Sequence, residues 1–174
     1  KSGSGYSISA SVLSGDDDAK ERDYDWHSAR HMADLDSATK IGTRAGERAV
    51  KRLNPGTVKS GQMPVVFDPR VGGSFVGHLL GGISGSAIAR KTSFLLESLG
   101  AQLFDSSISI VDDPHRMRGL GSRAFDGEGL PTARRSIIDK GVLTGWLMES
   151  ASARQLGLEP TGHASRGISG APGV

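Results

Sequence analysis

The chain of 174 residues contains no cysteine. This absence excludes a disulfide scaffold, a zinc finger built on cysteine ligands and a cysteine nucleophile. A chain without cysteine also suits a reducing compartment, so we expect a cytoplasmic protein. No apolar run approaches the roughly 20 residues of a membrane span, and no charged-then-apolar signal peptide opens the chain. We therefore expect no membrane partner.

Neither positive nor negative charge is in large excess. The formal net charge is +2 and the sequence pI is about 9.1. The basic residues are scattered along the chain rather than gathered in a stripe, so we expect no nucleic-acid partner. Aromatic residues make up 5% and hydrophobic residues 36% of the chain, a lean but globular composition.

Glycine, in contrast, is abundant. The 25 glycines recur without a period, which excludes a collagen-like chain and a simple linker. Turns and close backbone contacts are the better explanation.

The first third of the chain predicts one strand and two helices. Residues 5–14 alternate apolar residues with serine, as a half-exposed strand does. The charged segment that follows predicts a loop from residue 16 and then a helix over 24–35. Asp36 or Ser37 caps a second predicted helix, which ends at residues 54–56 (Asn-Pro-Gly). Its inward residues recur every four positions: Ile41, Ala45, Ala49 and Leu53.

The remaining residues predict shorter elements, with a linker at 54–61. We expect a buried strand over 63–68, a helix over 71–82, a helix over 86–99 with Ile88, Leu95 and Leu99 inward, and a strand over 102–112. A long polar, glycine-rich loop over 113–133 precedes a hairpin over 134–148 that turns at 139–141. A short helix over 150–156 closes at Gly157, and 159–167 is a loop.

These elements predict an α+β fold with mixed or antiparallel sheets and interspersed helices. The start resembles the middle of a strand and the end lies in a loop, so we expect a fragment of a larger protein of two or three domains. Residues 1–56 would end one domain and residues 57–174 would begin the next.

Residues 71–82 (VGGSFVGHLLGG) combine helical apolar spacing with five glycines and His78. On an ideal helix the apolar side chains of Phe75, Val76, Leu79, Leu80 and Ile83 share one arc. His78 lies outside that arc, on the glycine-rich face. The first interpretation is that another element approaches this face closely and that His78 bonds a carbonyl there. A zinc site with two ligands from this helix lacks the second ligand.

Three other groups of residues suggest chemistry without completing a site. His27 and His31 have i, i+4 spacing but lack the glutamate of a metalloprotease helix. The cluster of Asp112, Asp113, His115, Asp126 and Glu128 suits a hard cation or acid–base catalysis, while Asp before Pro or Gly also makes turns.

The loop that contains His163, Ser165 and Arg166 lacks the G-x-S-x-G elbow of a serine hydrolase. The chain also contains neither a P-loop nor a G-x-G-x-x-G motif. These residues alone therefore predict no complete catalytic site.

Long ordered motifs resemble the TldD/PmbA family (peptidase U62), in its PmbA or TldE branch. They are residues 64–95 (PVVFDPRVGGSFVGHLLGGISGSAIARKTSFL), 110–129 (IVDDPHRMRGLGSRAFDGEG) and 150–167 (SASARQLGLEPTGHASRG). The likeness extends back through residues 21–35 (ERDYDWHSARHMADL) and covers nearly the whole chain. The family's full chains are more than twice as long, which implies the end of a middle domain followed by the first part of the C-terminal domain.

In this family, TldD-type members resemble zinc metalloproteases with an H-E-x-x-x-H helix and a further ligand nearer the C-terminus. Laid on this sequence, the helix falls on residues 73–78, where Gly73 replaces the first histidine and Ser74 the glutamate. His78 alone remains. The resemblance therefore implies a subunit with no catalytic residue and no metal of its own.

The leading hypothesis from the resemblance is a TldE-like, non-catalytic subunit of a bacterial two-subunit protease. Its TldD-like partner supplies the zinc, and unfolded peptides are the substrates. Channel or partner contacts are expected from His78, Asp113, His115, Asp126, Glu128, His163 and Arg166. One alternative is an autonomous metal-dependent hydrolase that uses Asp112, Asp113, His115 and Asp126. Another is a binding module that modulates DNA gyrase, an older label of the family.

Overall fold

The computed structural model describes residues 3–16 and 19–174, and the contacts divide the chain into two units. The first unit contains the residues up to Pro64 together with Met117–Leu120. The second contains Val65–Arg116 and Gly121–Val174. No helix within the described ranges is long and apolar enough to cross a membrane.

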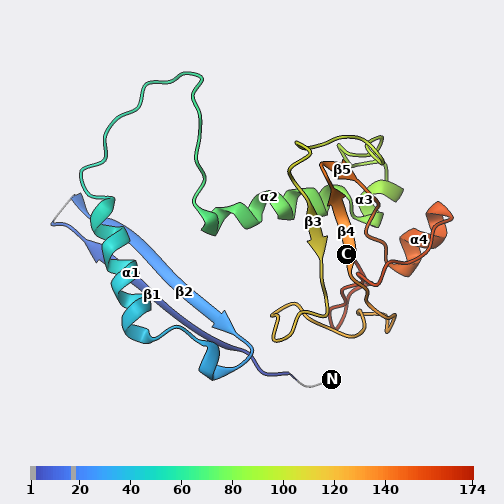
Figure 1. Cartoon of the computed structure of the whole chain (residues 1–174), viewed down its shortest axis with the longest axis horizontal. Helices are drawn as coiled ribbons and strands as arrows, with labels where there is room; N and C mark the ends of the chain where they lie inside the picture. Colours follow the sequence, from blue (N-terminus) through green and yellow to red (C-terminus); the bar gives the residue numbers. More distant parts are fainter. Residues whose placement is uncertain (1–2, 17–18) are drawn as a thin grey trace. The chain divides into compact units, whose positions relative to one another are not determined.

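The first unit is a β-hairpin covered on one face by a helix (Figure 1). Strands β1 (Tyr6–Ser14) and β2 (Glu21–Ala29) pair antiparallel, with Tyr6 opposite Ala29 and Ser14 opposite Glu21. A short 3-10 helix, η2 (Met32–Asp34), leads to α1 (Ala38–Lys51). The predicted strand over 5–14 is confirmed. The loop predicted from residue 16 includes residues 17–18, which lie outside the described residues.

Helix α1 confirms the second predicted helix. The Ser37 hydroxyl accepts the backbone N–H of Lys40, so Ser37 is the N-cap. Ile41, Ala45 and Ala49 are buried against the hairpin at the predicted four-residue spacing.

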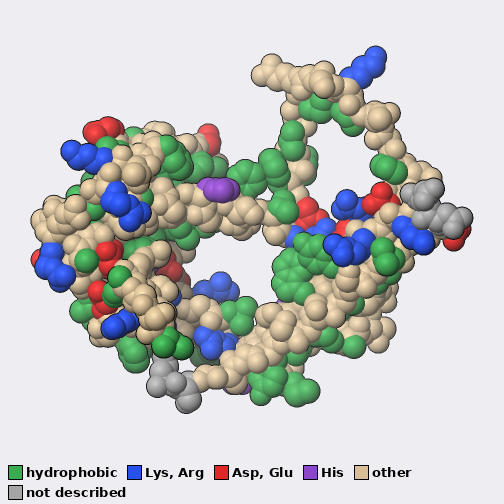
Figure 2. All heavy atoms as spheres, turned by 180° about the vertical axis from the view of Figure 1, so that it is seen from behind, with side chains coloured by type: hydrophobic (Ala, Val, Ile, Leu, Met, Phe, Trp, Pro, Cys, Tyr) green, Lys and Arg blue, Asp and Glu red, His purple; other side chains and the backbone are tan. Residues whose placement is uncertain are grey.

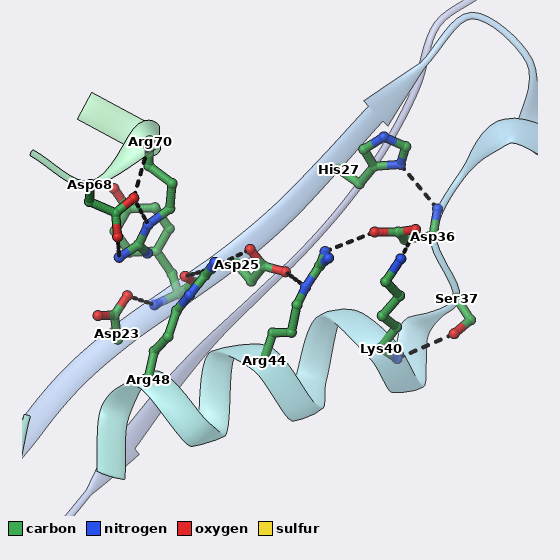
Figure 3. A network of polar contacts seen from close by, with 11 residues as sticks. Asp23, Asp25, His27, Asp36, Ser37, Lys40, Arg44, Arg48, Asp68 and Arg70 are labelled. Atoms are coloured by element: carbon green, nitrogen blue, oxygen red, sulfur yellow. Dashed lines mark hydrogen bonds and ion pairs between the residues drawn. The ribbon is translucent and has the colours of Figure 1, made fainter. Parts of the chain in front are cut away.

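The helix predicted over 24–35 is wrong, because residues 21–29 form strand β2. Asp23 and Asp25 are buried on the face under α1, while Tyr24 and Trp26 stack on the opposite, exposed face. The Asp25 carboxylate lies between Arg44 and Arg48 of α1 (Figure 3). The many charged residues of this segment suggested a solvent-exposed helix. In the structure its side chains instead alternate between the two faces of a sheet. Ion pairs with arginines of α1 offset the free-energy cost of burying these carboxylates.

The second unit surrounds a three-stranded antiparallel sheet in the order β3-β4-β5. Its elements are α2 (Pro69–Gly82), α3 (Gly85–Ala89), β3 (Ile110–Asp112), β4 (Arg135–Asp139), β5 (Val142–Leu143) and α4 (Ser150–Leu156). The helices and the sheet share one core, made by Leu79, Ile83, Ile88, Leu95, Ile137, Ile138, Leu143, Trp146, Leu147, Met148 and Ala153. The α+β class is therefore correct.

Three local predictions for this unit are confirmed. Residues 69–82 are helical, the hairpin turns at Lys140 and Gly141, and α4 ends at Gly157. Gly157 has a φ of 67°, the left-handed conformation expected of a helix C-cap. Gly141 has a φ of 83°, and a Cβ there would lie 2.2 Å from the carbonyl oxygen of Phe104.

The strand predicted over 63–68 is wrong. Val66 is 96% exposed, and Val65 and Phe67 are exposed as well. No other described segment pairs with these residues. The segment ends instead at Asp68, whose side chain caps the start of α2.

The helix predicted over 86–99 is shorter than expected, because α3 ends at Ala89. Lys91 has a φ of 58°, which a continuing helix does not permit. The Ser93 hydroxyl then donates to the carbonyl of Gly82 and accepts the N–H of Leu95, so it replaces helical bonds. Ile88 and Leu95 are buried as predicted, but Leu99 is 53% exposed.

The strand predicted over 102–112 is confirmed only at Ile110–Asp112. Asp105 accepts the backbone N–H of Ser107, and Leu103 donates its N–H to the carbonyl of Gly141. An Asx-type turn thus interrupts the extended run. The loop predicted over 113–133 contains no helix or strand, only an isolated bridge between Phe125 and Pro131.

Candidate functional site

Helix α2 carries the positions that the sequence singled out. The Asp68 carboxylate accepts the backbone N–H of Arg70, and Pro69 occupies the first turn, where its missing N–H costs nothing. Only the C-terminal part of the helix packs on the core, through Leu79 and the following Ile83, while Phe75 is 53% exposed. The N-terminal half of α2 projects from the core of its unit (Figure 1).

The glycines of α2 face open space, except at its end. A Cβ added to Gly72, Gly73, Gly77 or Gly81 would meet nothing within 4 Å. At Gly82 it would lie 3.0 Å from Leu95. The expected close approach of another element is therefore correct at Gly82 and wrong at the other four glycines within the described parts of the chain.

His78 is exposed beside an apolar cavity of about 360 Å³ that Phe75, Phe94 and Phe104 also line. Its ring makes no hydrogen bond to any described residue. The expected bond from His78 to a carbonyl is thus wrong, and the imidazole is accessible from outside.

The residues of α2 do not fit a zinc ion. A zinc site needs at least three protein ligands. Gly73 has no side chain, Ser74 is not a zinc ligand of the usual type, and His78 is one donor. Within residues 3–16 and 19–174, no group of three or more His, Cys, Asp or Glu side chains could hold a metal ion.

A histidine–aspartate pair lies elsewhere in the second unit. The Nε2 of His163 is 3.1 Å from a carboxylate oxygen of Asp112, and its Nδ1 is 2.8 Å from the hydroxyl of Thr161. A carboxylate only accepts, so Nε2 carries the proton and Nδ1 accepts from Thr161. The backbone N–H of Met148 donates to the same hydroxyl at 2.7 Å. This chain fixes the orientation and tautomer of the imidazole.

Burial lowers the pKa of His163, and the positive charges of Arg135 and Arg123 lower it further. The Asp112 carboxylate acts in the opposite direction but does not compensate. His163 is therefore neutral at neutral pH. Both ring nitrogens are engaged, so the imidazole positions the Asp112 carboxylate at the edge of the site and offers no hydrogen bond of its own to a ligand.

Asp126 has a structural role. One carboxylate oxygen accepts the backbone N–H groups of Glu128 and Leu130, each at 2.9 Å, and the other accepts that of Ala164 at 3.1 Å. The side chain is buried and joins the long loop to the segment before Ser165. Both oxygens are engaged, as the turn interpretation of Asp before Gly requires.

Glu128 and Glu149 both accept hydrogen bonds from the first turn of α4. Glu128 accepts the backbone N–H and the hydroxyl of Ser150, at 2.9 and 2.6 Å. Glu149 is the N-cap and accepts the N–H and hydroxyl of Ser152. Hydrogen bonds from Ser152 outweigh the effect of burial and keep the pKa of Glu149 low.

The remaining predicted site residues lie apart from one another. Asp113 accepts the N–H of His115, and the ring of His115 is 3.1 Å from the hydroxyl of Thr132. Arg166 is exposed. The structure thus pairs Asp112 with His163, and it does not gather Asp112, Asp113, His115 and Asp126 around one point.

A cavity of about 600 Å³ adjoins the Asp112–His163 pair. Apolar residues of α2, β3 and β4 line most of it, while Asp112, Arg123, His163 and Ser165 form its polar end. Sequence reasoning missed Arg123 and Arg135 here. No spacing marks them, because they reach His163 only through the tertiary fold.

The Lys and Arg side chains show no continuous basic stripe on the face of the molecule in Figure 2, where they lie among acidic, hydrophobic and other residues. Within the first unit, Arg44 and Arg48 pair with Asp25, and Arg44 also pairs with Asp36.

Comparisons with known proteins agree on one family. Residues 60–174 match the model of the PmbA/TldA metallopeptidase C-terminal domain. The chain is 42% identical over 159 residues to the metalloprotease PmbA of Escherichia coli O157:H7, covering 91% of this chain and 35% of that protein. It is 39% identical to a PmbA homologue from Haemophilus influenzae, with the same coverage. The chain thus spans about a third of the length of these relatives.

Solved structures share the fold. One from Bacteroides thetaiotaomicron, described as a proposed modulator of DNA gyrase, superposes with a TM-score of 0.84 at 35% identity, covering 90% of this chain and 36% of that chain. TldE from Thermococcus kodakarensis superposes with a TM-score of 0.85 at 24% identity, covering 98% of this chain and 38% of that chain. The family match over residues 60–174 shows that this chain belongs to the PmbA/TldD family of metallopeptidase-type proteins.

Proposed function

We propose that this chain belongs to a non-catalytic, TldE-like subunit of a two-subunit zinc protease that processes unfolded peptides. The observation that carries the proposal is the composition of α2. Gly73 and Ser74 stand where the family's H-E-x-x-x-H pattern has a zinc ligand and the catalytic glutamate. His78 alone remains of that pattern, so a homologous partner with the intact motif supplies the zinc.

The glycine face of α2 supports this role. Gly72, Gly73, Gly77 and Gly81 leave the helix backbone bare, and nothing in the described chain fills the space beside them. A bare backbone permits close approach by another chain. In this proposal the face contacts the TldD-like partner or the peptide that passes between the subunits.

Five of the seven expected peptide contacts now separate into two groups. His78, His115 and Arg166 are exposed, and the proposal retains them as contacts. Asp126 and Glu128 act indirectly, because their oxygens hold backbone groups of the loop and of α4. They would position the polar end of the larger cavity rather than touch a peptide.

Metal analysis and co-purification test the proposal. The purified full-length protein alone should hold no tightly bound zinc and should not cleave unfolded peptides. A homologous chain with an intact H-E-x-x-x-H motif should co-purify with it and restore cleavage. His78→Ala should leave the zinc content of the complex unchanged. One zinc per chain in the isolated protein, with cleavage abolished by His78→Ala, would contradict the proposal.

A further inference from the structure

The cavity of about 600 Å³ in the second unit has an apolar body and a polar end. Val76 and Leu80 of α2, Ile110 of β3 and Ile137 of β4 contribute apolar walls. A volume of this size is typical of a site for a small ligand or a short peptide segment.

Arg123 lines the polar end of this cavity, and Arg135 lies close enough to lower the pKa of His163. The Nε–H groups of Arg123 and Arg135 are buried and donate no hydrogen bond to any described residue. Neither guanidinium forms an ion pair with a described residue. Arg135 stands directly opposite Asp112 in the β3–β4 pairing and two residues before Ile137, on the same face of the sheet. Leaving such a buried donor unsatisfied costs about 1–3 kcal/mol.

Arg123, Arg135, Asp112 and His163 together carry one net positive charge. Arg123 and Arg135 are cationic, Asp112 is anionic, and His163 is neutral because burial and the two arginines lower its pKa. Asp126 does not line the cavity, and both its carboxylate oxygens accept backbone N–H groups. The polar end of the cavity therefore favours an anion, and a guanidinium binds a carboxylate with two parallel hydrogen bonds.

We propose that this cavity binds the C-terminal end of a peptide whose last residues are apolar. The terminal carboxylate pairs with Arg123, beside Arg135, and the apolar side chains contact Val76 and Leu80. The carboxylate of Asp112 accepts the last amide N–H of the peptide. This inference rests on the proposed function, because it names the class of peptide that such a subunit would hold.

The apolar walls favour a peptide end over an inorganic anion. A phosphate ion would satisfy the arginines but leave the walls of the cavity in contact with water, which gains no hydrophobic free energy. Asp112 beside the arginines also disfavours a multiply charged anion. An apolar residue with one terminal carboxylate matches both features.

Peptide binding by the purified full-length protein, without its partner, tests the inference. The probe is a fluorescent hexapeptide that ends in Leu-Leu, made with a free carboxylate and with a C-terminal amide. Amidation should weaken binding at least tenfold. Arg123→Gln should weaken binding of the carboxylate form by a similar factor and leave binding of the amide form unchanged. Arg134→Gln is the matched control, since Arg134 is 68% exposed, and it should bind like the wild type.

Three outcomes would overturn the inference. They are equal affinity for the two peptide forms, full affinity of Arg123→Gln for the carboxylate form, and displacement of the peptide by inorganic phosphate at similar concentration. Arg123→Gln removes an unpaired buried donor, so it should fold with an unchanged or higher Tm, and the variant remains informative. This binding assay needs neither the partner nor zinc. If the two-subunit complex forms but the isolated protein does not bind the peptide, the inference is refuted and the proposed function is not.

Discussion

The imidazole of His163 donates from Nε2 to the carboxylate of Asp112 across 51 residues of sequence, at 3.1 Å. Thr161 holds the other ring nitrogen, so the pair has one orientation. Burial lowers the pKa of the imidazole, and the two guanidinium groups nearby lower it further, so the ring is neutral. This arrangement makes the stability of the second unit depend on pH.

We expect the unfolding free energy to fall as the pH drops below about 6.5, the pKa of an unfolded histidine. The pKa of His163 is lowered in the folded state, so the unfolded state binds the additional proton and gains from acid. The unfolding free energy continues to fall until the pH is below the pKa of His163 in the folded state. His163→Gln, which can still donate to Asp112, should flatten this dependence in urea titrations between pH 7.5 and 5. His78→Gln, at an exposed histidine, should keep the wild-type slope, and an unflattened slope in His163→Gln would contradict the assignment.

A second pH effect arises from Asp25 in the first unit. Burial opposes the ionisation of Asp25, but hydrogen bonds from Arg48 and Arg44 outweigh it and lower its pKa. The stabilisation is therefore present above the unfolded pKa of about 3.9 and is lost as acid protonates the folded carboxyl.

Asp25→Asn should lower the unfolding free energy by about 1–3 kcal/mol at neutral pH. The arginines are about a third exposed, so solvent screens part of the interaction and the lower half of that range is expected. Glu47→Gln on the exposed face of α1 is the control and should change stability little. Equal stability of the two variants would show that the Asp25 ion pairs contribute nothing net.

Gly85 and Gly73 should respond in opposite ways to alanine. A Cβ at Gly85 would lie 2.6 Å from the sulfur of Met148 and 2.8 Å from the Cβ of Ser152, so Gly85→Ala should cost about 1–3 kcal/mol. Gly73→Ala adds a methyl group in open space on a helix and should stabilise by about 0.5–1 kcal/mol. Thermal and urea unfolding of both variants measures the contrast. Similar effects at the two positions would mean that α2 and α3 pack differently from the arrangement described.

Association with the proposed partner offers a separate prediction for Gly73. Gly73→Leu should leave the isolated protein folded, because the added side chain meets no described atom, yet should weaken the complex at least tenfold. Gly61→Leu, also in open space but outside α2, should associate normally. Analytical ultracentrifugation of each variant with the partner measures this. Normal association of Gly73→Leu would remove the glycine face of α2 from the interface.

Asp126 should prove structural rather than catalytic. Asp126→Asn replaces one accepting oxygen by a donor that meets another donor, the N–H of Glu128 and Leu130 or that of Ala164. The expected loss is about 1–3 kcal/mol of unfolding free energy. The measurement is urea unfolding together with peptide cleavage by the two-subunit complex at a temperature where the variant is folded. Lost cleavage in a fully stable variant would instead support a direct chemical role.

Much of the local structure could be predicted because short-range patterns carry it. Ser37 caps α1, a four-residue apolar period fills its buried face, and Gly157 ends α4. The long helix prediction over 86–99 failed for a local reason too, since Ser93 bonds to the backbone and Lys91 adopts a positive φ. The spacing of apolar residues does not show that the Ser93 side chain competes with helical hydrogen bonds for backbone groups.

The sequence by itself determined that α2 lacks a metal ligand and a glutamate at Gly73 and Ser74, since side-chain identity needs no fold. Only the tertiary structure decided that residues 21–29 are a strand, because the buried Asp25 needs Arg44 and Arg48 from a helix formed later in the chain. The fold alone also brought Asp112, Arg123 and His163 to one cavity. Ionic and polar groups act over a few ångströms in space, and sequence separation does not record that distance.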